Sequence, residues 1–66
     1  MFTREDATTA LMEYLGRAEN EIGLFYESAM VEPDGIVVYF FTVRTNEGWQ
    51  CFAVYRDNDG INIVRE

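Results

Sequence analysis

The chain of 66 residues contains no lysine and no histidine, and it has one cysteine and one proline. The side chains that most often act as a base near neutral pH are therefore absent, so neither Ser28 nor Cys51 has a partner that would activate it as a nucleophile. A single cysteine excludes an internal disulfide. No apolar run approaches the roughly 20 residues of a membrane span, and no N-terminal segment resembles a signal peptide. These absences favour a soluble, cytoplasmic protein without catalytic residues.

Acidic residues dominate the charged positions. Twelve aspartates and glutamates stand against five arginines, which gives a formal charge of −7. Hydrophobic residues make up 48% of the chain, too many for a disordered acidic tail, so we expect the charge on the surface of one folded domain, residues 1–66. Such a surface repels nucleic acid and attracts basic proteins. The sequence therefore predicts a cationic partner.

The first element is an amphipathic helix, expected over about residues 4–19. Thr3 and Asp6 have the spacing of a capping box at its start. Apolar residues then recur three and four positions apart, as on one buried stripe of a helix: Ala7, Ala10, Leu11, Tyr14, Leu15 and Ala18. Asn20 and Gly23 are suitable places for the chain to turn away.

After the helix, alternating apolar residues and three glycine-containing turns indicate strands. The turns cover residues 32–35, 45–48 and 57–60, and each fits a type I turn that joins a hairpin. The predicted strands are about 24–32, 36–45, 49–57 and 61–65. We therefore expect an α+β fold in which one N-terminal helix packs on a four-stranded antiparallel meander.

The turns also predict the pairing of the strands. If each glycine forms a bulge, the residue before the turn pairs with the residue after the glycine. This gives three pairs: Glu32 with Ile36, Thr45 with Trp49, and Asp57 with Ile61. Counting outward places one set of side chains on the face assigned to the helix: Phe25, Ala29, Val31, Val37, Tyr39, Phe41, Val43, Trp49, Cys51, Ala53, Tyr55, Ile61 and Ile63. Cys51 is interpreted as a small core residue.

The opposite face of this predicted sheet is also apolar, and one helix cannot cover both sides. Its uncovered residues form a candidate hydrophobic interface: Val38, Phe40, Phe52 and Val54. An exposed apolar patch of this kind is typical of a dimer or partner surface. A partly exposed sheet face in a small monomer is the alternative.

A calcium site is the other chemistry to consider. The turn Asp57-Asn58-Asp59-Gly60 resembles the start of a calcium-binding loop. That loop needs glycine at its sixth position and a bidentate glutamate at its twelfth, and this turn has neither. A hairpin turn explains the residues better, so we expect no metal site and no cofactor.

The distribution of acids supplies the candidate partner-binding residues. Glu19 and Glu21 are expected near the helix C-terminus, where carboxylates oppose the helix dipole and so are not explained by local stability. Others are expected on the helix flank or at turns. The full set is Glu13, Glu19, Glu21, Asp34, Glu47, Asp57 and Asp59.

In size, acidity and aromatic-rich αβ composition, the chain resembles small acidic inhibitors of phages and mobile elements, in particular anti-CRISPR proteins that block the DNA-binding surface of a type I Cascade complex. The resemblance implies a DNA mimic that binds a basic Cascade subunit in the host cytoplasm and prevents target DNA from docking. An immunity protein that neutralises a basic toxin is the alternative. An acid-dependent enzyme or metal-binding domain is a third class, for which no residue pair stands out.

Overall fold

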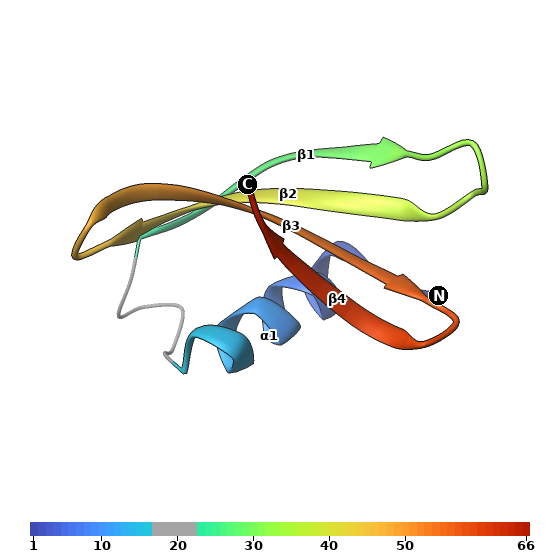
Figure 1. Cartoon of the computed structure of the whole chain (residues 1–66), viewed down its shortest axis with the longest axis horizontal. Coiled ribbons are helices and arrows are strands. Elements are labelled where there is room, and N and C mark those ends of the chain that lie inside the picture. The colour runs from blue at the N-terminus through green and yellow to red at the C-terminus, as the bar shows by residue number, and fades with distance from the viewer. Residues whose placement is uncertain (17–22) are drawn as a thin grey trace.

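One helix and four strands follow each other along the chain in the computed structural model, which describes residues 1–16 and 23–66. Helix α1 spans Arg4–Leu15, and the strands are β1 (Leu24–Val31), β2 (Val37–Thr45), β3 (Gly48–Asp57) and β4 (Gly60–Arg65). The strands form one antiparallel sheet in the order β1-β2-β3-β4, with α1 on one side of it and closest to β3 (Figure 1). The predicted α+β meander is confirmed.

Both ends of α1 are set by local hydrogen bonds. The Thr3 hydroxyl accepts from the Asp6 amide at 3.1 Å, and the Asp6 carboxylate accepts from the Thr3 amide at 3.0 Å, so the predicted capping box is confirmed. Gly16 adopts φ 70°, a left-handed conformation that glycine tolerates, and its amide donates to Met12 and Glu13 carbonyls. The helix therefore ends four residues before the predicted boundary at 19.

The cap makes the stability of the fold sensitive to acid. Hydrogen bonds from the Thr3 backbone and then the Thr3 side chain lower the pKa of Asp6 from its ordinary 3.8. A lowered folded-state pKa adds stability above the unfolded value, and this contribution disappears as the pH falls through the folded value.

We expect Thr3→Ala to reduce the free energy of unfolding at neutral pH by about 1 kcal/mol, the usual cost of losing a cap. Thr3→Ala keeps the Thr3 backbone amide, which is the larger cause of the lowered pKa of Asp6, and removes only the hydroxyl, so the difference between the variant and the unmodified chain is expected to shrink slightly below the ordinary pKa of 3.8. Urea unfolding of both proteins across this range measures it. If the difference in free energy of unfolding between the two proteins became larger in acid, it would contradict the capping role assigned to Thr3 and Asp6.

The pairing of β3 differs from the prediction by one residue at both of its hairpins. Thr45 pairs with Gly48, and Asp57 pairs with Gly60, so neither pairing uses the residue after the glycine. Because side chains alternate between faces, a shift of one residue transfers every β3 side chain to the other face relative to β2. Because both hairpins of β3 shift by one residue, the shifts cancel between β2 and β4. The side chains of these two strands therefore keep their predicted faces relative to each other.

The β1–β2 hairpin follows the predicted pairing near its turn and departs from it further along. Ala29 lies opposite Tyr39, and the Glu32 amide donates to the Ile36 carbonyl at 2.8 Å. A bulge between Tyr26 and Ser28 then shifts the beginning of β1 by one residue. A bulge reverses the faces of the residues before it, so Phe25 lies on the side opposite to the predicted one.

The core lies between α1 and the sheet. Phe41 at the centre of β2 is completely buried, and Ala7 and Leu11 meet the sheet from the helix. The buried cluster consists of Ala7, Leu11, Phe41, Val43, Phe52 and Val54, with Phe2, Met12, Leu15, Leu24, Tyr39 and Ile63 packed against it. We call this side of the sheet the helix-bearing face.

The structure corrects half of the predicted hydrophobic interface. Phe52 and Val54 belong to the buried core, because the one-residue shift of β3 turns them toward α1. Val38 and Phe40 lie on the other side as predicted, although Val38 is itself buried among its neighbours. We call this side the open face: Phe25, Ser28, Met30, Val38, Phe40, Thr42, Arg44, Trp49, Cys51, Ala53, Tyr55, Asn62 and Val64. Cys51 is thus a half-buried residue of the open face, not of the helix-bearing face.

Candidate functional site

The predicted partner-binding acids lie at both ends of the sheet. In a meander, the first and third turns share one end and the second turn lies at the other, as Figure 1 shows. Asp34 is in the first turn, Asp57 directly precedes the third turn and Asp59 lies within it, so these three share an end. Glu47 is in the second turn at the opposite end. Glu19 and Glu21 fall outside the described residues.

Two shallow hollows join acids that are far apart in the sequence. One is lined by Asp34, Ile36, Arg56, Asp57 and Asn58. The other is lined by Phe2, Asp6, Thr9, Ala10, Glu13, Arg56 and Ile61. Arg56 lines both, so the two hollows adjoin at one arginine, and four acidic residues from the helix and two turns line one or the other of them. We call Asp6, Glu13, Asp34 and Asp57 the acidic band.

Arg56 is positioned by an aromatic ring. Its guanidinium carbon lies 5.5 Å from the centre of the Phe2 ring, within the range of a cation–π contact. The Phe2 ring in turn packs edge-on against Tyr39, at 6.0 Å between ring centres, and the Tyr39 hydroxyl donates to the Phe2 carbonyl at 3.2 Å. These contacts attach the N-terminal segment to β2 and β3. One arginine offsets one of the four negative charges, so the band keeps an acidic excess.

Two carboxylates of the acidic band also accept hydrogen bonds within their own turns. The Asp34 carboxylate accepts from the Ile36 amide at 3.1 Å, and the Asp57 carboxylate accepts from the Asp59 amide at 2.9 Å. Aspartate often closes turns in this way, and asparagine can do the same. Each bond uses one oxygen of the carboxylate, which leaves further acceptor positions for a partner. The turns therefore present these carboxylates in fixed directions.

The structure adds two residues to the predicted site. Arg56 lies between the two hollows because the observed pairing of β3 places it opposite Ile61 on the helix-bearing face. Asp6 was predicted as a cap, and its capping geometry is also what fixes its carboxylate in the band. The signal in the sequence for Arg56 was its position directly before the turn at residues 57–60, since both then lie at one end of β3.

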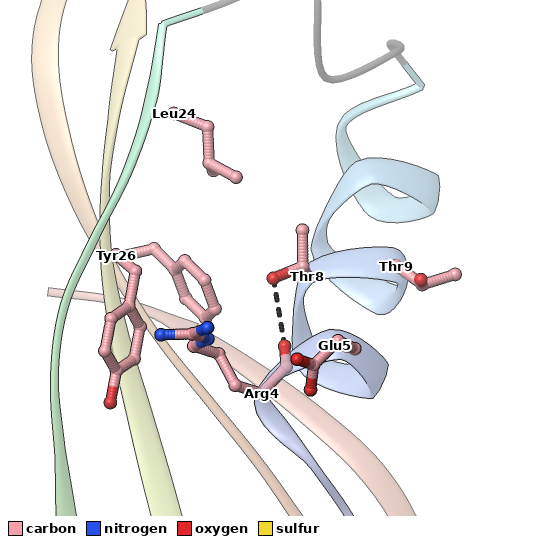
Figure 2. Close-up of a pocket in the computed structure, with 7 residues that line it drawn as sticks. Arg4, Glu5, Thr8, Thr9, Leu24 and Tyr26 are labelled. Atoms are coloured by element: carbon pink, nitrogen blue, oxygen red, sulfur yellow. Dashed lines mark hydrogen bonds between the residues drawn. The ribbon is translucent and has the colours of Figure 1, made fainter.

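A third hollow lies between α1 and β1, lined by Arg4, Glu5, Thr8, Thr9, Leu24, Tyr26 and Phe41 (Figure 2). The Arg4 guanidinium carbon lies 4.9 Å from the centre of the Tyr26 ring. The Thr8 hydroxyl donates to the Arg4 carbonyl at 2.9 Å within the helix. Arg44 stacks similarly on Trp49, at 5.8 Å. Arg4, Arg44 and Arg56 thus all lie over aromatic rings.

In residues 1–16 and 23–66, no group of three or more aspartate, glutamate, cysteine or histidine side chains is arranged to hold a metal ion. In the same residues, no helix is long and apolar enough to cross a membrane. Comparisons of the chain with protein-family models, with curated proteins and with solved structures found no match. The candidate site therefore rests on its own geometry.

Proposed function

We propose that the protein is a small, non-enzymatic inhibitor that occupies the nucleic-acid-binding surface of a basic protein. The observation that supports this function is the acidic band, in which the helix and two turns contribute four acidic residues to two hollows that adjoin at Arg56. A nucleic-acid-binding surface presents arginines and lysines to successive phosphates. Carboxylates held on a rigid surface can compete for the same side chains, because arginine binds carboxylate and phosphate with the same forked geometry.

The net charge supports the electrostatic part of this proposal. Arg4, Arg44 and Arg56 lie against Tyr26, Trp49 and Phe2, respectively. The formal charge of −7, which already counts these arginines, gives the chain a strongly negative long-range field. Such a field increases the rate at which a basic partner is encountered.

A type I Cascade complex is the first target to test, since the chain resembles inhibitors that block DNA docking there. The assay is competition between the protein and target DNA for the purified complex. The proposed function predicts that the protein prevents DNA from binding and is not consumed or turned over. A basic toxin captured from host lysate and identified by mass spectrometry, without an effect on Cascade, would instead assign the same acidic surface to an immunity protein.

Binding to the basic partner is expected to weaken as salt increases. The screening length falls from about 8 Å at physiological ionic strength to about 3 Å at 1 M, so attraction between exposed charges fades. Isothermal titration or surface plasmon resonance over this range measures the change. A dissociation constant that is unaffected by salt would exclude phosphate mimicry as the basis of binding.

A further inference from the structure

The open face of the sheet exposes large apolar side chains. Met30 is 50% exposed and Val64 is 42% exposed, on the two edge strands, while Phe25 and Trp49 are exposed toward one end of the sheet. Phe40 lies between them, directly opposite Ser28 on one side and Ala53 on the other, and Ala53 faces Val64. An apolar surface therefore runs across all four strands.

The centre of this surface carries no charge. Its central row, Ser28–Phe40–Ala53–Val64, contains no charged side chain, whereas Arg44, Asp57 and Glu66 belong to other rows of this side. A basic partner would find few carboxylates to pair with there. A second copy of this acidic chain, by contrast, can approach this face with less repulsion than any surface that carries the acids.

The size of the face matches a small dimer interface. The fold measures 35 × 17 × 16 Å, so a side along its longest axis covers at most about 600 Å², and two copies would bury at most about 1,200 Å². This is at the lower end of specific interfaces, and the aromatic and methionine side chains present are those enriched in interface cores.

We propose that the open face binds a second copy of this chain, with the two sheets stacked face to face around a two-fold axis. Sheets that stack in this way lie about 10 Å apart and interlock their side chains. A two-fold axis makes the interface self-complementary, so each open-face residue contributes twice. Phe40 and Val64 would lie within the interface and α1 would remain on the outer side of each copy.

The test uses neighbouring residues of β1 that point to opposite sides. Met30→Asp places a charge on the open face, whereas Val31→Asp places the same charge on the helix-bearing side of the same strand, where Val31 is 68% exposed. Analytical ultracentrifugation over a concentration series gives the dimer dissociation constant. Met30→Asp is expected to raise it by at least tenfold, because two unpaired charges enter the interface, and Val31→Asp is expected to leave it nearly unchanged.

A second variant and two spectroscopic measurements distinguish loss of the dimer from loss of the fold. Val64→Asp should weaken the dimer as Met30→Asp does, while the far-ultraviolet circular dichroism of all three variants stays that of the folded chain. Trp49 is the only tryptophan and lies on the open face, so its emission should shift to shorter wavelength as the unmodified protein dimerises. A monomer at millimolar concentration overturns the proposal. Equal weakening by Met30→Asp and Val31→Asp also overturns it, since that result indicates pairing along the β1 edge.

Discussion

Phe52→Ala is expected to remove a large part of the stability of the fold. Phe52 is 3% exposed and meets the Tyr14 ring edge-on at 6.4 Å, within the cluster that joins α1 to β3. Truncation of a buried phenylalanine costs about 3–5 kcal/mol. A chain of 66 residues is expected to have only about 3–10 kcal/mol in total, from typical stability per residue. The variant should therefore be close to unfolded at room temperature.

Phe40→Ala is the matched control, because both residues were predicted on the same uncovered face. Phe40 is half-buried on the open face, so we expect a loss of about 1–2 kcal/mol. Urea unfolding compares the free energies of unfolding of the two variants. It is done in dilute solution, where self-association does not contribute. Equal losses would contradict the observed pairing of β3 and favour the pairing expected from the sequence.

Removing the charges of the acidic band is expected to have the largest effect on partner binding. The triple variant Glu13→Gln, Asp34→Asn and Asp57→Asn removes three negative charges while it keeps an oxygen at each position. Asparagine still accepts the amide hydrogen bonds that close the two turns. Loss of about 1 kcal/mol for each ion pair would weaken binding about a hundredfold in total.

Glu47→Gln tests whether the effect belongs to the band or to charge in general. Glu47 lies in the turn between β2 and β3, at the end of the sheet away from Asp34 and Asp57. We expect little change in the dissociation constant from this variant. The competition assay with DNA measures the dissociation constant of the triple variant and that of Glu47→Gln. A folded triple variant that still displaces DNA fully would show that the band is not the binding surface.

Local signals in the sequence were sufficient for the elements and their order. Thr3 and Asp6 specify where the helix begins, and the glycines at 35, 48 and 60 mark the three hairpins, where all adopt positive φ. Gly16 also carries the signal that ends the helix, but glycine within a periodic apolar stripe is equally compatible with continuation. The stripe continued in the sequence to Ala18, so the boundary was placed too late.

The sequence was not sufficient to assign side chains to the two faces of the sheet. A change of one residue in the pairing of two strands moves every side chain of a strand to the other face. A turn with glycine at positive φ fits either pairing of its flanking residues, so nothing local distinguished Gly48 from Trp49 as the partner of Thr45. The bulge in β1 lies within Tyr26-Glu27-Ser28, which contains no glycine or proline from which it could be predicted. The sequence shows Arg56 next to the third turn, but its place beside Asp34 of the first turn and beside the helix follows from the pairing of the strands and was not visible in the sequence.

The separation of the two faces has a consequence for how tightly the protein could hold its target. The open face and the helix-bearing face are opposite sides of one sheet, so copies joined through the first both keep α1 and Glu13 directed outward. Such a pair would be bivalent. On a target with repeated basic subunits, the second copy would bind at the high effective concentration set by the first, and avidity can exceed the single-site affinity by about 10²–10⁴ when the spacing of the sites permits. A modest contact at each acidic band would then suffice for durable inhibition.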